Sequence, residues 1–127
     1  MKVLIVDDSR IMRRMISGAV SVLGYEILEA ANGREALEVV RSNPSDLAAI
    51  TMDINMPEMS GMECLEAIMG DDDISDIPVI MITTESEKEK TLEAIRLGAR
   101  HYITKPFTPE DVTTRLMDVL GSDDEFS

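Results

Sequence analysis

The sequence is poor in cysteine and in long apolar runs, and these absences exclude several classes of protein. A single cysteine, Cys64, cannot form a disulfide within the chain and suits a reducing compartment. No apolar run approaches the roughly 20 residues of a membrane-spanning helix. The short apolar run in MKVLIVDDS ends in two aspartates, unlike a secretory signal peptide. We therefore expect a cytoplasmic protein without a membrane anchor.

Positive charge is also scarce. The chain has 12 lysines and arginines against 25 aspartates and glutamates, which gives a net charge of −13. Such a surface repels the phosphates of nucleic acids and anionic lipids at long range. The glycine-rich phosphate-binding motifs G-x-x-x-x-G-K-[ST] and G-x-G-x-x-G are absent. We expect neither direct nucleic-acid binding nor membrane binding.

The 127 residues alternate between short apolar runs and amphipathic segments. This length fits one domain, which we assign to residues 1–121, followed by a short acidic tail, 122–127. Short continuous apolar runs are typical of strands that are buried on both faces of a parallel sheet. They predict five strands: Val3–Val6, Glu26–Ala30, Ala48–Met52, Val79–Thr83 and Tyr102–Thr104.

Helix signals lie between and after these strands. Each segment starts with a capping residue or proline and ends at or near a glycine in most cases. The predicted helices run from Ser9 to about Leu23, from Asn32 through Arg34–Arg41, from Ser60 to Gly70, from Ser86 to Gly98, and from Pro109 to Leu120. Alternation of strand and helix predicts an α/β fold, an open five-stranded parallel sheet with helices on both faces.

Polar residues stand where four of the predicted strands end. Asp7 and Asp8 follow the first strand, Asp53 follows the third, Thr83 ends the fourth, and Lys105 follows the fifth. The carboxyl ends of parallel strands share one edge, where open α/β sheets bind their ligands. A single aspartate at such a position often only caps a helix or starts a turn. The convergence of four strand ends favours a functional site instead.

The charges of these residues indicate which ligand they suit. Carboxylates crowded together have raised pKa values unless a cation neutralises them. Mg²⁺ prefers oxygen ligands, and three carboxylates, one lysine and one such ion sum to zero charge. An ionised carboxylate can attack phosphorus without a general base. The pattern thus predicts an aspartyl phosphate whose charge is stabilised by Mg²⁺, by Lys105 and by the hydroxyl of Thr83.

Four motifs carry a resemblance to a known family. VLIVDDS at 3–9, MDINMPEMSG at 52–61, MITT at 81–84 and YITKPF at 102–107 resemble the receiver domain of bacterial two-component response regulators. Their spacing agrees with that family over essentially the whole chain. The chain is most similar to the stand-alone, CheY-like chemotaxis type. This resemblance implies a flavodoxin-like sheet with strand order 2-1-3-4-5.

The resemblance also implies a role for each site residue. Asp53 is the phosphoacceptor, and Mg²⁺ is bound directly by Asp8, by Asp53 and by the backbone carbonyl of Asn55. Asp7 acts on the ion through a water molecule. Lys105 contacts the phosphoryl group.

Further residues are implied to transmit or limit the signal. Thr83 and Tyr102 form a switch pair, in which Thr83 moves toward the phosphoryl group and Tyr102 turns inward. Asn55 and Glu85 influence how fast the phosphoryl group is lost. The Lys105–Pro106 peptide is expected to be cis.

The implied partners are a histidine kinase, as phosphodonor, and a downstream protein. The target is expected on the face built from the fourth helix, the fifth strand and the fifth helix. The chain is expected to be a monomer. It is not a classical enzyme, since it catalyses only its own phosphorylation and dephosphorylation. We expect no output domain after Gly121 and therefore expect the signal to pass by protein contact. The sequence names neither the kinase nor the target.

Several other functions share part of this pattern. A phosphatase of the haloacid dehalogenase type needs a second aspartate two positions after its nucleophile, where this chain has Asn55. A flavodoxin-like carrier needs a first loop rich in serine and threonine, whereas Asp7 and Asp8 would repel a flavin phosphate. A phosphorelay intermediate and a non-phosphorylated acidic scaffold remain as alternatives.

Overall fold

A computed structural model describes the backbone of residues 1–124 and the side chains of residues 1–120. Five parallel strands form one sheet in the order β2-β1-β3-β4-β5, which confirms the predicted topology. Every predicted strand is found, and no end differs from the prediction by more than one residue. The strands are β1 (Lys2–Val6), β2 (Glu26–Ala30), β3 (Leu47–Asp53), β4 (Val79–Thr84) and β5 (His101–Lys105).

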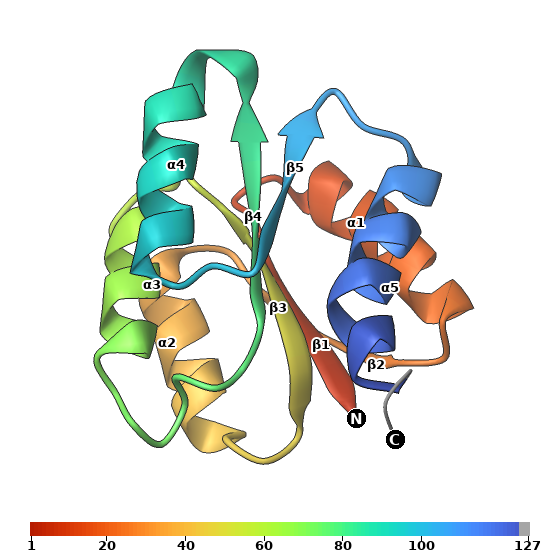
Figure 1. Ribbon diagram of the computed structural model, residues 1–127, viewed down its shortest axis with the longest axis horizontal. Coiled ribbons are helices and arrows are strands. Elements are labelled where there is room, and N and C mark those ends of the chain that lie inside the picture. The colour runs from red at the N-terminus through yellow and green to blue at the C-terminus, as the bar shows by residue number, and fades with distance from the viewer. Residues whose placement is uncertain (125–127) are drawn as a thin grey trace.

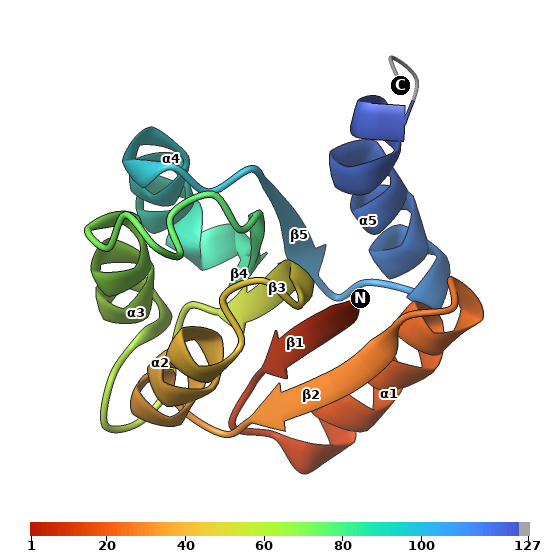
Figure 2. The same cartoon turned by 90° about the horizontal axis from the view of Figure 1, so that it is seen from below.

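Helices cover both faces of the sheet, as Figures 1 and 2 show. One face is covered by α1 and α5, which pack against each other, and the other face by α2, α3 and α4. The helices are α1 (Arg10–Val22), α2 (Gly33–Ser42), α3 (Gly61–Met69), α4 (Lys88–Leu97) and α5 (Pro109–Asp124). Within the described part of the chain, none is both long and apolar enough to cross a bilayer.

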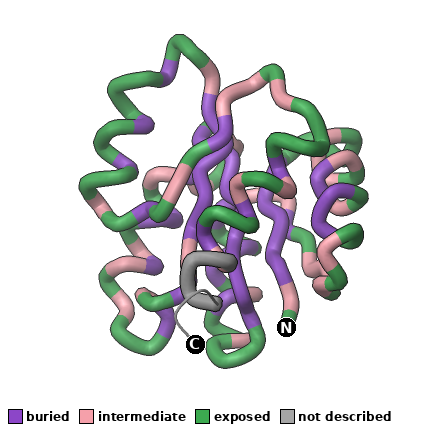
Figure 3. Tube along the Cα trace, turned by 45° about the vertical axis from the view of Figure 1, so that its right-hand side comes forward, coloured by how far each residue is buried: buried purple, intermediate pink, exposed green. Residues whose placement is uncertain are grey.

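The core is divided into two layers by the sheet. Along β1, Val3 and Ile5 face the layer under α1 and α5, whereas Leu4 and Val6 face the layer under the other helices. All seven residues of β3 are buried, since this central strand is covered on both faces. Figure 3 shows long buried stretches in the interior of the molecule, with the exposed residues mainly in the helices and loops around them. This buried sheet fixes the positions of the strand ends that carry the polar residues.

Three of the predicted helix caps are present. The side chain of Ser9 accepts a hydrogen bond from the backbone N–H of Met12, and that of Asn32 accepts one from Glu35. Ser60 forms a reciprocal capping box with Glu63 at the start of α3. Each cap satisfies a backbone donor that the first helical turn leaves free and contributes about 1 kcal/mol.

The predicted start of the fourth helix at Ser86 is wrong. A 3₁₀ turn, η1 (Glu85–Glu87), comes first, and α4 begins at Lys88. The backbone N–H and the hydroxyl of Thr84 both donate to the carboxylate of Glu87, at 2.9 and 3.0 Å. These two bonds tighten the chain between β4 and α4, so a turn starts one residue before Ser86, and the α-helix starts two residues after it.

The predicted end of the last helix at Leu120 is also wrong. The backbone of α5 continues through Gly121 to Asp124. A glycine weakens a helix by about 1 kcal/mol without forcing it to end. Residues 122–124 of the predicted tail are therefore helical, and residues 125–127 lie outside the described residues.

Candidate functional site

The carboxyl edge of the sheet brings the predicted site residues together. Val6 of β1 pairs with Met52 of β3, so the residues that follow them, Asp7 and Asp53, lie at the same level of adjacent strands. The chain connections leave β1 and β3 in opposite directions at this point of the strand order. This is the position at which open α/β sheets bind ligands.

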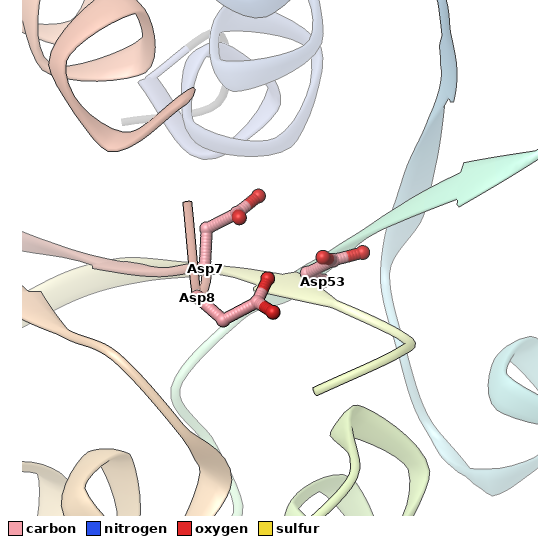
Figure 4. Close-up of side chains that lie close together, drawn as sticks. All are labelled: Asp7, Asp8 and Asp53. Atoms are coloured by element: carbon pink, nitrogen blue, oxygen red, sulfur yellow. The ribbon is translucent and has the colours of Figure 1, made fainter. Parts of the chain in front are cut away.

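Three carboxylates converge at this edge (Figure 4). One oxygen each of Asp7, Asp8 and Asp53 lies within 4.8 Å of the others. Asp7 and Asp53 are buried, whereas Asp8 is exposed. The cluster is therefore open to solvent on the side of Asp8. Among the described residues no second group of three potential ligands is found.

Lys105, the last residue of β5, supplies a positive charge to this cluster. Its Nζ lies 3.5 Å from Oδ1 of Asp53 and 4.0 Å from Oδ2 of Asp7. The pKa of Asp53 is raised to about 6, mainly by burial and then by the charge of Asp7, against the opposing charge of Lys105. Burial also raises the pKa of Asp7, against the backbone N–H of Ser9 and the charge of Lys105. The single ammonium of Lys105 cannot balance three carboxylates, so the cluster keeps an excess of negative charge when they are ionised.

The donor set fits a hard dication. Oδ1 of Asp7 accepts a hydrogen bond from Ser9 at 2.8 Å, but the buried Oδ2 has no hydrogen-bond partner among the described residues. A buried carboxylate oxygen without a donor is costly unless a cation balances it. Mg²⁺ binds such clusters through one or two carboxylates and keeps several waters. The resemblance to receiver domains implied a Mg²⁺ site at this place, and the acidic cluster is present.

Arg13 of α1 stabilises the loop that carries the first two aspartates. Its Nη1 donates to the backbone carbonyl of Asp7 at 2.6 Å, and its Nε pairs with Glu29 of β2 at 2.9 Å. The sequence did not indicate this role, because the contact with Glu29 depends on where α1 packs.

The two residues predicted to form a switch lie on neighbouring strands. Thr83 is buried near the end of β4, and its hydroxyl lies 2.7 Å from the hydroxyl of Thr91 on α4. Tyr102 on β5 points to solvent, with 43% of its surface exposed. Between them lies a pocket of about 260 Å³, formed by residues of β4, η1, α4 and β5. The movement predicted for this pair stays a prediction.

Among the described residues, no hydrogen bond joins Asn55 to Glu85, the other residue expected to influence loss of the phosphoryl group. The side-chain amide of Asn55 donates to the carboxylate of Glu87, which is buried, whereas Glu85 is exposed in η1. Glu87 also accepts the two hydrogen bonds from Thr84. It therefore ties the loop after Asp53 to the loop after Thr83.

Sequence reasoning missed Glu87, although the sequence contains a signal for it. Residues 84–87 read Thr-Glu-Ser-Glu, the spacing of a capping box. Nothing in that pattern indicates the bond to Asn55. The predicted cis peptide between Lys105 and Pro106 is present.

Comparison with known proteins gives consistent results. The family described as "Response regulator receiver domain" matches residues 3–117. The chemotaxis protein CheY1 of Helicobacter pylori is 45% identical over 125 residues, which cover 98% of this chain and 100% of that protein. A CheY homologue of Campylobacter jejuni is 42% identical over 96% of this chain and 94% of its own length. The crystallised chemotaxis protein CheY4 of Vibrio cholerae is 39% identical with a TM-score of 0.84, over 94% of this chain and 98% of its own.

Proposed function

The chain belongs to the response regulator receiver family, and from this we propose that it is switched by a phosphoryl group on Asp53. Receiver domains act in phosphorylation-dependent signalling. The observation that supports Asp53 as the acceptor is its place in the cluster. It is a buried carboxylate that lies beside two other aspartates, with the ammonium of Lys105 at 3.5 Å.

Asp8, Asp53 and the backbone carbonyl of Asn55 would hold Mg²⁺, and Asp7 would reach it through water. The orphaned oxygen of Asp7 and the shared position of the three carboxylates support this assignment. When bound, the ion would neutralise carboxylate and phosphoryl charge. The chain itself contributes the positions of its ligands, which are set by the ends of β1 and β3.

In the proposed reaction, a carboxylate oxygen of Asp53 attacks the phosphorus of a phosphohistidine. The new O–P bond forms as the P–N bond breaks, and the electron pair of that bond goes to the histidine nitrogen. A pKa of about 6 leaves Asp53 mostly ionised at pH 7, so no general base is needed. Lys105 lies close enough to place its ammonium on a phosphoryl oxygen.

The phosphorylated state would differ in the region of Thr83 and Tyr102. We propose that the hydroxyl of Thr83 bonds to the phosphoryl group and that Tyr102 enters the adjacent pocket. Phosphorylation can bias this equilibrium only by stabilising one of the two states more than the other. The difference supplies the signal.

The proposed target surface is the face formed by α4, β5 and α5. It exposes large apolar side chains from each element: Leu92 and Ile95 of α4, Tyr102 of β5 and Met117 of α5. Leu92, Ile95 and Tyr102 also line one pocket, and exposed apolar residues that lie together favour a protein partner. CheY-like receiver domains interact with histidine kinases and with downstream proteins. The names of the relatives lead us to propose that the pathway is chemotaxis. We also propose that the protein is a monomer and acts in the cytoplasm.

Beryllofluoride, a stable analogue of the phosphoryl group, tests this function. ¹⁹F NMR of the protein with Mg²⁺ and beryllofluoride should show a bound signal that depends on Mg²⁺. The signal should be absent in Asp53→Asn and present in the control Asp76→Asn, which changes an exposed aspartate distant in sequence from the cluster. A bound signal that persists in Asp53→Asn would contradict the assignment.

A further inference from the structure

The hydroxyl of Thr83 is already engaged in this structure, and its partner lies on α4. The oxygens of Thr83 and Thr91 are 2.7 Å apart, and the two residues are only 2% and 6% exposed. A buried hydrogen bond of this kind is shielded from competition by water. It is a direct connection between the site edge of β4 and α4.

The distance between the two hydroxyls fits either direction of donation. The hydroxyl of Thr91 lies 3.0 Å from the backbone carbonyl of Glu87, four residues earlier, to which a threonine inside a helix commonly donates, and a hydroxyl has one proton. We therefore assign Thr83 as the donor and Thr91 as the acceptor. The other acceptor within reach of Thr83 is the backbone carbonyl of Thr84, at 3.1 Å. Neither acceptor belongs to the cluster of Asp7, Asp8 and Asp53.

The position of Thr91 is fixed by contacts at the start of α4. The carbonyl that it bonds belongs to Glu87, whose carboxylate is held by Thr84 and by Asn55. Thr91 also lines the pocket beside Tyr102. An oxygen held in this way is a fixed acceptor for the proton of Thr83.

We propose that Thr91 is a positioning residue, which holds the hydroxyl of Thr83 away from the site and competes with the phosphoryl group for its proton. The inference rests on the proposed function, because it requires a phosphoryl group on Asp53. Activation then breaks the bond between Thr83 and Thr91. Loss of that bond frees the first turns of α4 from β4 on the side where Tyr102 would enter.

The test compares the affinity for beryllofluoride, in the presence of Mg²⁺, among variants of the full chain. Thr91→Val removes the competing oxygen and keeps the branched shape, so the affinity should rise about two- to tenfold, the factor expected for one neutral hydrogen bond. Thr91→Ser keeps the oxygen and should restore the original affinity. Thr113→Val is the matched control. Its hydroxyl also donates to a helix carbonyl, that of Glu110, but lies on α5.

The decisive arm repeats Thr91→Val in a chain that carries Thr83→Ala. The proposal predicts that the gain in affinity disappears there, because no hydroxyl is left to release. An equal gain in both backgrounds would show that residue 91 acts only through packing, and no gain in the original background would also overturn the proposal. If Thr91→Val does not fold, Thr91→Ala is measured by the same criterion. Failure of the unmodified chain to bind beryllofluoride would instead refute the proposed function, and the inference with it.

Discussion

The ammonium of Lys105 lies 3.5 Å from Oδ1 of Asp53, although 52 residues separate them in the chain. The sheet creates this contact, because Lys105 pairs with Thr84 of β4 and Asp53 pairs with Ile82 of the same strand. The contact is not sufficient to neutralise the site. The pKa of Asp53 is still raised to about 6, since burial and Asp7 outweigh the lysine.

The raised pKa of Asp53 predicts that its ionisation destabilises the protein without divalent metal. The ordinary pKa of 3.8 applies to the unfolded chain, so below pH 3.8 both states are protonated and no penalty exists. The penalty grows as the pH rises to about 6 and then stays constant at about 3 kcal/mol. In Asp53→Asn the penalty is absent. The unfolding free energy of this variant should therefore exceed that of the original chain by a margin that increases from pH 4 to pH 7.

Urea denaturation in EDTA at several pH values measures this margin. Asp76→Asn provides the control, because Asp76 is exposed in the loop before β4 and should show no such dependence. Saturating Mg²⁺ at pH 7.5 should stabilise the original chain more than Asp53→Asn, since only the original chain keeps all proposed ligands. A margin independent of pH would contradict the account.

Removing the lysine charge should separate metal binding from phosphoryl transfer. In Lys105→Met, the loss of a positive charge within 4.0 Å of two carboxylates should tighten Mg²⁺ binding about tenfold. The rate of phosphorylation by acetyl phosphate should fall by roughly tenfold or more, because the charge on the phosphoryl oxygens loses a partner.

Calorimetric titration of Mg²⁺ and the time course of phosphorylation give the two quantities. Lys90→Met, at an exposed position of α4, removes the same formal charge and controls for the effect of net charge. If both quantities change in the same direction in Lys105→Met, the lysine does not have the proposed role.

The site could be predicted from the sequence where it depends on strand ends, and not where it depends on helix packing. Asp7, Asp53 and Lys105 were identified because parallel strands bring their carboxyl ends to one edge. Capping residues such as Ser9 and Ser60 were identified because a cap is a local contact. The order and spacing of the four motifs also carried the family likeness, and with it the strand order.

Glu87 and Thr91 were missed because their contacts depend on how α4 packs against the rest of the chain. Glu87 bonds to Asn55, 32 residues away, and that contact exists only once α4 packs beside the loop after β3. The hydroxyl pair of Thr83 and Thr91 likewise depends on the tilt of α4 over β4. A threonine in a helix is ordinarily read as a surface residue, whereas Thr91 is buried.

Two glycines with contrasting surroundings test the packing beneath the site. A Cβ added at Gly61 would collide with the backbone carbonyl of Asp53 and lie 2.9 Å from Cα of Ile54. Gly61→Ala should destabilise the protein by about 2 kcal/mol or more and slow phosphorylation, because the backbone of the acceptor must shift. Gly18 of α1 has no atom within 4 Å of such a Cβ, so Gly18→Ala should be neutral or stabilise by up to about 1 kcal/mol. Equal effects on unfolding in urea would show that the backbone at Gly61 is not constrained as described.

Two nearby glutamates test the connection between the loops. Glu87→Gln keeps the shape of the side chain, but an NH₂ group replaces one of the oxygens that accept hydrogen bonds from Thr84 and Asn55. It should lower the unfolding free energy by about 1–3 kcal/mol, the cost of unsatisfied buried groups. Glu85→Gln, at the exposed neighbour, should change it by less than about 0.5 kcal/mol. A larger effect at Glu85 than at Glu87 would mean that the buried carboxylate does not join the loops.

The most direct measurement is the intact mass of the protein after incubation with Mg²⁺ and acetyl phosphate. The account predicts a gain of one phosphoryl group. Addition of EDTA before the phosphodonor should prevent this gain. The gain should vanish in Asp53→Asn and persist in Asp76→Asn. No gain in the original chain, under conditions where Mg²⁺ binding is detected, would contradict the account, as would an unchanged gain in Asp53→Asn.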